Sequence, residues 1–198
     1  MYRWLSLIVA LLGLAVPLRV AGAPPQPTYG TAVIDGQYSE WNLADDYFAD
    51  MYLGGDQGEP TESRLYLRYD NARAILYALV LCAPTVTGYV GQSTAWIALD
   101  LENPKAVSQG SGNDGTPPDF AWVGQSYDGS PQHVRGFEAS LWMAPGDHLI
   151  VVQAGILNPA DGVPAIASIP AGGAEISIPV PAIEIEQTSF GAVRALYR

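Results

Sequence analysis

The stretch Val33-Ile34-Asp35-Gly36-Gln37-Tyr38-Ser39-Glu40-Trp41 is the most informative part of this sequence. An apolar strand end runs into an Asp-Gly pair, and an acidic–aromatic pair follows it. Asp35-Gly36 suits a tight turn, because Gly adopts positive φ without strain and the Asp side chain can bind the backbone just ahead. A large Trp directly after such a turn can seal one end of a β-sandwich. The stretch therefore points to an all-β fold that opens with this turn.

The rest of the chain predicts strands. Residues 64–69 alternate in polarity and residues 75–82 are continuously apolar, which predicts a hairpin with one wet face on its first strand and a second strand covered on both faces. Further strands are predicted over residues 94–101, 120–125, 136–143, 148–156, 163–169 and 174–185, with a Gly/Ser/Asn/Pro loop over 105–118. Residues 41–52 fit either a short helix or an irregular strand. The predicted fold class is all-β, a two-sheet antiparallel β-sandwich of about nine or ten short strands with at most one short helix besides the signal peptide.

The N-terminal residues 1–22 are typical of a secretory signal peptide, with Arg3 before an apolar core and small residues at the end. The alternative is an uncleaved anchor, but the apolar run is short for a membrane span of about 20 residues. A Pro-rich extended leader is expected over 23–30, the β-sandwich domain over 31–187 and a C-terminal tail over 188–198. We therefore expect a secreted or cell-surface protein that does not span the membrane after cleavage.

The chain is strongly acidic, with a formal net charge of −11. Because the signal peptide carries two of the nine basic residues and no acid, cleavage changes this charge to −13. Such a charge argues against nucleic acid and anionic membrane surfaces as partners, since both require Lys and Arg. It suits calcium binding, and it equally suits solubility through charge alone.

Cys82 is the only cysteine, so no intrachain disulfide can form. It lies inside the continuously apolar segment, which favours a buried thiol over a bridge between chains.

In this order of strands the chain resembles the family-9 carbohydrate-binding-module-like superfamily, which is similar in architecture to DOMON domains. The resemblance covers about residues 31–156 and rests on four ordered motifs: Ile34-Asp35-Gly36 with Glu40-Trp41, Tyr69-Asp70 with Leu76-Tyr77-Ala78-Leu79-Val80, Trp96-Ile97-Ala98-Leu99-Asp100, and Phe137-Glu138-Ala139-Ser140-Leu141. It implies a β-sandwich of two antiparallel sheets that often carries calcium.

The chain departs from these families where they bind their ligands. No two tryptophans align with the pair of aromatic rings that holds a sugar in the founding modules. No spacing singles out a Met–His pair among Met51, Met143, His133 and His148 as haem ligands of the DOMON kind, so haem is not expected. The resemblance therefore implies the fold and leaves the ligand open.

Sugar binding requires aromatic faces and polar partners, because sugar C–H groups stack on Trp and Tyr while hydroxyls need carboxylates or amides. The candidate ligand-binding residues are Trp96, Trp122, Tyr127, Glu138 and Trp142. Each Trp also fits a packing role in the sandwich, and both interpretations stay open. Trp41 is more typical of packing.

Calcium prefers six to eight oxygen ligands, often from Asp, Asn and backbone carbonyls of Gly-rich loops. The candidate metal ligands are Asp35, Glu40, Asn113, Asp114 and Asp119. None matches the EF-hand pattern, and all of them also fit solvated turns.

Catalysis has little support, since the sequence has no G-x-S-x-G elbow, no H-E-x-x-H motif and no phosphate-binding Gly loop. No nucleotide cofactor is therefore expected. The sequence favours a secreted, non-enzymatic module that binds a glycan, with calcium supporting its loops. The alternatives are a structural or interaction protein that contacts extracellular protein surfaces and, behind both, a haem or redox carrier. The oligomeric state stays open.

Overall fold

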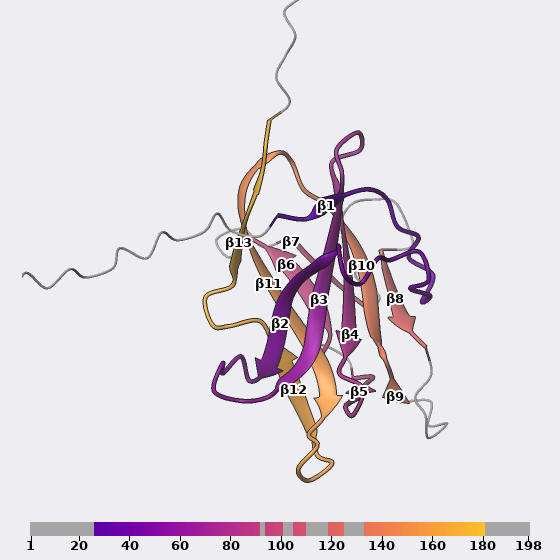
Figure 1. Cartoon of the computed structure of the whole chain (residues 1–198), viewed down its shortest axis with the longest axis vertical. Coiled ribbons are helices and arrows are strands. Elements are labelled where there is room, and N and C mark those ends of the chain that lie inside the picture. Colours follow the sequence, from indigo (N-terminus) through magenta and orange to yellow (C-terminus); the bar gives the residue numbers. More distant parts are fainter. Residues whose placement is uncertain (1–25, 92–93, 101–104, 110–118, 125–132, 181–198) are drawn as a thin grey trace, which may run out of the picture.

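The computed structural model describes residues 26–91, 94–100, 105–109, 119–124 and 133–180, which form strands and turns (Figure 1). The thirteen strands are β1 (Thr28–Tyr29), β2 (Tyr47–Leu53), β3 (Thr61–Asp70), β4 (Ile75–Cys82), β5 (Thr87–Tyr89), β6 (Trp96–Leu99), β7 (Lys105–Ser108), β8 (Phe120–Val123), β9 (His133–Val134), β10 (Gly136–Trp142), β11 (Gly146–Leu157), β12 (Pro164–Ser168) and β13 (Ala174–Ile178). The predicted all-β class is confirmed. No helix in the described ranges is long and apolar enough to cross a membrane. The predicted signal peptide and the tail lie outside these ranges.

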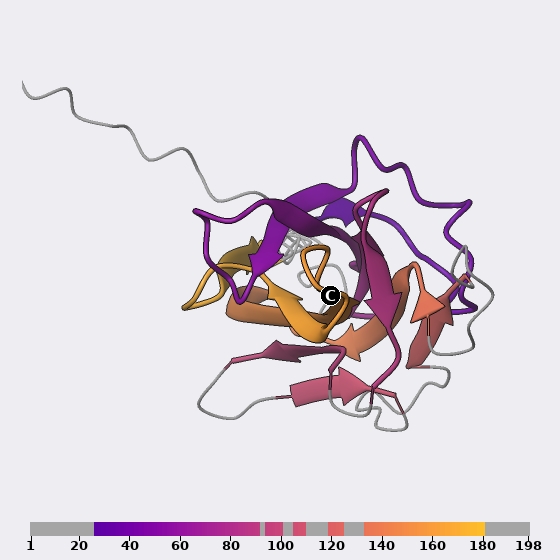
Figure 2. The same ribbon diagram turned by 90° about the horizontal axis from the view of Figure 1, so that it is seen from below.

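The strands form one continuous hydrogen-bonded network in the order β7-β6-β11-β12-β2-β3-β4-β10-β8, so a division into two separate sheets is not seen. β12 makes the connection, since it pairs with β11 along its length and with β2 through Ala167 and Ser168. At the far end of this order, β7 lies near β10. The network therefore curls around a shared core (Figure 2).

β3 and β4 form the predicted hairpin, with unbroken register from the Ser63–Cys82 pair to the Asp70–Ile75 pair. All eight residues of β4 are buried. Its inner face, with Leu76, Ala78 and Val80, belongs to the main core. Its outer face belongs to a second apolar cluster, so the prediction of a strand covered on both faces is confirmed.

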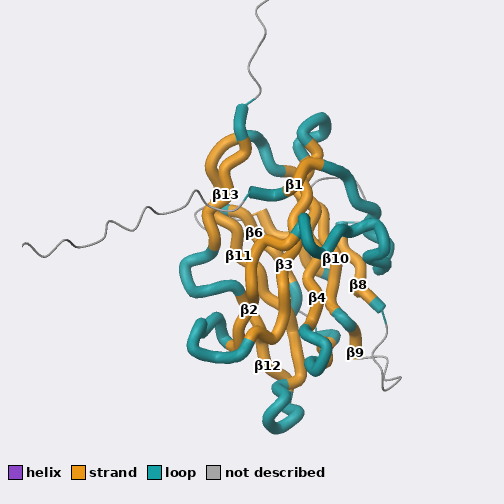
Figure 3. Tube along the Cα trace, in the orientation of Figure 1, coloured by secondary structure: helices purple, strands orange, loops and turns teal. Residues whose placement is uncertain are grey.

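The cover over this outer face is the segment of residues 30–46, which we call the N-terminal strap. It runs as a loop from β1 toward β10 and β8 and returns to β2 (Figure 3). Ile34 and Trp41 of the strap pack on Tyr66, Tyr77 and other side chains of the outer cluster. The wet face predicted for β3 is therefore largely covered, because the strap lies over it.

The segment before the strap also belongs to the fold. β1 pairs in parallel with β3, through Thr28 with Arg68 and Tyr29 with Tyr69. The Gln26 side chain accepts a hydrogen bond from the Ser177 amide of β13 at 3.2 Å. The folded part of the chain thus includes residues that the sequence assigned to an extended leader.

For residues 41–52 the structure selects one of the two alternatives that the sequence left open, and at β7 it departs from the sequence-based expectation. Residues 41–52 contain no helix, and β2 is an irregular strand whose register with β3 shifts after Tyr47 and after Met51. These shifts break the alternation of two, so that Phe48 and Met51 both reach the core. β7 lies in a segment predicted as a loop, where Val107 is buried in the core between polar and small neighbours.

The core holds the sulfur-containing side chains of Cys82, Met51 and Met143. Cys82 is a free, buried cysteine as predicted, and burial raises the pKa of its thiol to about 11. Met51 and Met143 are also core residues with almost no exposed surface, so neither presents its sulfur to a ligand at the protein surface.

The β3–β4 turn holds Ala74 at a positive φ of 55°, where an L side chain is strained. We expect Ala74→Gly to stabilise the protein by about 0.5–1 kcal/mol, because Gly removes that strain at a modest entropic cost. The free energy of unfolding from urea titration checks this. Ala72→Gly is the control, since Ala72 in the same turn is not at positive φ and Gly should give no gain there. A loss of stability in Ala74→Gly would contradict the expectation.

Candidate functional site

Glu138 is the buried polar group on which the strap is anchored. It lies on the outer face of β10, where residues alternate with the core residues Phe137 and Ala139, and it has no exposed surface. Its Oε2 accepts hydrogen bonds from the amides of Gly36 at 2.9 Å and Asp35 at 3.3 Å. Its Oε1 accepts one from the Trp41 indole Nε1 at 2.9 Å. The two halves of the opening motif, the Asp-Gly turn and the Trp, therefore meet on one carboxylate.

The sequence-based assignment of Glu138 as a ligand-binding residue needs correction. A ligand cannot reach the side chain in this structure, because the strap covers it and the chain itself supplies three donors. Burial raises the pKa of Glu138 to about 7, against the opposite effect of the Trp41 and Gly36 hydrogen bonds. In this structure the side chain therefore anchors the strap.

Gly36 is required where the strap turn meets β8. Its φ is 81°, and a Cβ built on it would lie 2.4 Å from the Trp122 carbonyl oxygen. Its own carbonyl accepts a hydrogen bond from the Gly124 amide at 3.3 Å. The turn therefore closes on the open edge of β8 with no space for a side chain.

A second buried carboxylate, Asp46, holds the other end of the strap. Its Oδ2 lies 2.7 Å from Arg68 Nη2 and also accepts a hydrogen bond from the Asn42 amide. Burial acts to raise the pKa of Asp46, but the hydrogen bonds from Arg68, Thr28 and the Asn42 amide together lower it.

Arg68 also lies 5.1 Å from the centroid of the Trp41 ring and donates to the Glu40 carbonyl at 2.8 Å. It thereby connects the two anchors, because Trp41 binds Glu138. Neither Arg68 nor this role of Asp46 was predicted from the sequence. One feature of the sequence could have indicated Arg68. It is a large cationic residue within an alternating strand, on the face that was predicted to contact solvent.

The structure separates the candidate sugar-binding residues. Trp122 is partly buried and packs against Phe120 and Phe137, with ring centroids 5.0 Å and 6.4 Å away. Trp96 is also partly buried, on β6. Trp142, at the end of β10, is 43 % exposed, the most of the described tryptophans. Tyr127 lies outside the described residues.

The candidate metal ligands are only partly described. Asp35 accepts a hydrogen bond from the Gln37 amide, and Glu40 accepts one from the Val33 amide, so both carboxylates serve turns within the strap. Asp119 precedes β8, and Asn113 and Asp114 lie outside the described residues. Within the ranges that the structure describes, no group of three or more His, Cys, Asp or Glu side chains could hold a metal ion.

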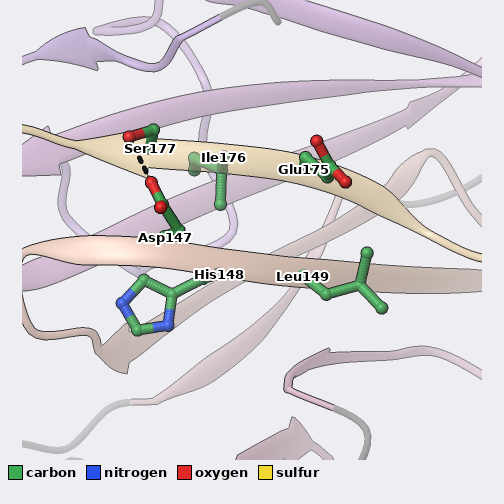
Figure 4. Close-up of a pocket in the computed structure, with 6 residues that line it drawn as sticks. All are labelled: Asp147, His148, Leu149, Glu175, Ile176 and Ser177. Carbon is green, nitrogen blue, oxygen red and sulfur yellow. Dashed lines mark hydrogen bonds between the residues drawn. The ribbon is translucent and has the colours of Figure 1, made fainter.

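A groove of about 500 Å³ lies along β11 and β13, with Asp147, His148 and Leu149 on one strand and Glu175, Ile176 and Ser177 on the other (Figure 4). Asp147 accepts a hydrogen bond from the Ser177 hydroxyl across the two strands.

The histidine of this groove is fixed within the fold. Its Nδ1 lies 2.8 Å from Asp100 Oδ2 and its Nε2 lies 2.8 Å from the Ala144 carbonyl oxygen. Because both ring nitrogens face oxygen atoms of the chain, the imidazole ring is held in place by the protein itself. The arrangement ties the end of β6 to the turn before β11.

We expect Gly36→Ala to destabilise the protein by about 3 kcal/mol or more, since the substitution adds a backbone clash to the strain of positive φ. Gly54→Ala is the matched control. Gly54 has a φ of 58°, and nothing lies within 4 Å of its added Cβ, so it carries the strain without the clash and should cost about 1 kcal/mol. Urea unfolding of both variants measures the difference. Equal losses would show that the contact with β8 is unimportant.

Stability should fall as pH rises from 5.5 to 8. Since the pKa of Glu138 is raised to about 7 in the folded protein, the folded state holds this proton more tightly than the unfolded chain, and that advantage is lost as pH passes 7. The expected loss is about 1–2 kcal/mol in the free energy of unfolding, and Glu138→Gln should remove it. Glu175→Gln, on the exposed side of β13, should keep the full pH dependence. An unchanged pH profile in Glu138→Gln would contradict this.

Comparison of this chain with protein-family models, with curated proteins and with solved structures finds no match.

Proposed function

We propose that this chain is a secreted, non-enzymatic module that binds carbohydrate, with Trp142 as the aromatic platform. The observation that carries the proposal is the gradient of exposure along the outer face of β10. Glu138 and Ser140 are buried there, whereas Trp142 is 43 % exposed. A large aromatic side chain open to solvent at the end of an otherwise covered sheet face offers the surface on which sugar C–H groups stack.

The platform is held rigidly. The amide of Met143, directly after Trp142, donates to the Ala74 carbonyl of the β3–β4 turn at 2.9 Å. The Tyr69 hydroxyl donates to the Met143 carbonyl, also at 2.9 Å. Because the backbone on the C-terminal side of Trp142 is fixed by both bonds, binding requires little ordering of the protein.

The contacts of three described ionisable groups support binding over catalysis. Glu138 and Asp46 hold the strap, and both nitrogens of His148 are engaged by oxygen atoms of the chain. General acid–base catalysis requires such a group within reach of a substrate proton. These three groups are used inside the protein.

Calcium is part of the proposal as a support for the chain segment that precedes β8. Asp119, the described member of the candidate ligand set, accepts a hydrogen bond at its carbonyl from the Ser140 amide, two residues before Trp142. A cation bound by Asp119 together with Asn113 and Asp114 would stabilise the sheet beside the platform.

One observation favours the second candidate function, a surface or matrix protein that contacts other proteins. Val163 and Ile166 are 56 % and 37 % exposed on the β11–β12 hairpin, which projects from one end of the molecule (Figure 1). Exposed apolar side chains on a projecting hairpin suit a protein contact. Stabilisation by calcium with no response to any sugar would favour this candidate.

Trp142→Ala should weaken carbohydrate binding about tenfold or more, because it removes the stacking surface. The measurement is a titration of intrinsic Trp fluorescence and melting temperature with cello-, xylo- and manno-oligosaccharides, in calcium and in EDTA. Tyr47→Ala is the control, because Tyr47 on β2 has the same exposed fraction of 43 % and should leave binding unchanged. The proposal fails if the unmodified protein responds to none of these sugars at millimolar concentration.

A further inference from the structure

We infer that the ligand of the Trp142 site is a neutral oligosaccharide that crosses the strands toward Arg73, and not a single sugar. The inference rests on the proposed function. It names the class of ligand from what lies beside the platform on the same sheet face.

Trp142 is the first member of a row across three strands. It pairs with Ile75 of β4, and Ile75 pairs in turn with Asp70 of β3. Directly paired residues of antiparallel strands point to the same face. Adjacent strands lie about 4.8 Å apart, so the backbone at Asp70 lies about 10 Å from that at Trp142. One stacked sugar covers the indole, and a second residue of a saccharide chain is needed to span this distance.

The far end of the row carries polar groups that suit sugar hydroxyls. The Arg73 side chain is 69 % exposed, and its Nε lies 3.7 Å from Asp70 Oδ2. Asp70 in turn accepts hydrogen bonds at Oδ1 from the amides of Ala72 and Arg73, which fixes the turn. Because the Arg73 side chain is this exposed, its N–H donors are open to solvent and available to a ligand.

The charge of this end points to a neutral ligand. Asp70 offsets the positive charge of Arg73, so this end of the row offers N–H donors without a net charge. The protein as a whole carries a formal charge of −11, which repels polyanionic glycans. The hydroxyl groups of a neutral sugar can hydrogen-bond to this pair, which has no net charge, and are not repelled by the negative charge of the protein.

The surface between Trp142 and Arg73 is compatible with a saccharide chain lying over it. Ile75, the middle member of the row, is only 8 % exposed and belongs to the outer apolar cluster. The saccharide would therefore contact the protein at its two ends, at the indole and at the guanidinium, and pass over buried apolar side chains between them. Two separated contacts make affinity depend on chain length.

The test compares cello-, xylo- and manno-oligosaccharides of one to four residues by calorimetric titration. For the unmodified protein, affinity for the series that binds should rise from one residue to three. Arg73→Ala should lower affinity for the trisaccharide about tenfold and leave that for the monosaccharide unchanged, since it removes one charge-assisted contact. Arg64→Ala is the matched control, because Arg64 is 56 % exposed and pairs with Asp50 on β2 at 3.4 Å.

The outcomes separate this inference from the function on which it rests. Full trisaccharide affinity in Arg73→Ala, or equal affinity of the unmodified protein for one and three residues, would overturn the inference and leave sugar binding at Trp142 intact. Undiminished binding in Trp142→Ala would overturn the site, and no binding of any sugar by the unmodified protein would overturn both. Equal melting temperatures of the Arg73→Ala and Arg64→Ala variants would show that neither result comes from unfolding.

Discussion

The carboxylate of Glu138 is the group on which the outer half of this protein depends. It has no contact with solvent, and an ionised carboxylate buried without partners would be strongly destabilising. The Asp35 and Gly36 amides and the Trp41 indole meet this requirement, and all three belong to the strap. The strap therefore does two things at once: it donates hydrogen bonds to the buried acid, and it covers the apolar face of the sheet. Removal of the strap would expose the acid and the apolar face together.

The strap also determines where the surface stays open. Its two anchors lie on β10 and β3, at Glu138 and Arg68, and the side chains near them are buried. Trp142, further along β10, is beyond this cover and exposed. The proposed sugar platform is thus the part of the outer face that the strap leaves uncovered, and its backbone is held by the turn that ends at Ala74. The region covered by the strap and the exposed Trp142 therefore lie on the same face of the sheet.

The residues that hold the strap at the Glu138 anchor could be located from the sequence, but the contacts between them could not. The turn motif, Trp41 and the Glu138 strand were each recognised, and Trp41 was assigned to packing correctly. Nothing local to Asp35 or Glu138 indicates that they meet, because 103 positions separate them and hydrogen-bond partners at that distance depend on the whole topology. The sequence therefore predicts separate roles for them, Asp35 as a metal ligand and Glu138 as a sugar ligand, and carries no sign of the contact between them.

The other differences have similarly specific causes. Trp142 was placed on the face of Glu138 and Ser140, but alternation along a strand cannot show where a covering loop ends. β7 has the sequence Lys-Ala-Val-Ser, in which Val107 is the one large apolar residue, and this pattern is too weak to distinguish a strand from a loop. In β2, the bulges produce a spacing that mimics a helix. Continuous apolar strands such as β4 were predicted well, because burial on both faces leaves a pattern that needs no knowledge of neighbours.

The distance along the chain between the strap turn and its anchor has a consequence for the time course of synthesis. Gly36 leaves the ribosome 102 residues before Glu138, which at usual elongation rates is an interval of roughly 5–20 seconds. During that interval the β3–β4 hairpin can form, but the anchor that fixes the strap over its apolar outer face does not yet exist. The nascent chain therefore carries an uncovered apolar surface until β10 is made, which makes this interval the period of greatest need for a chaperone.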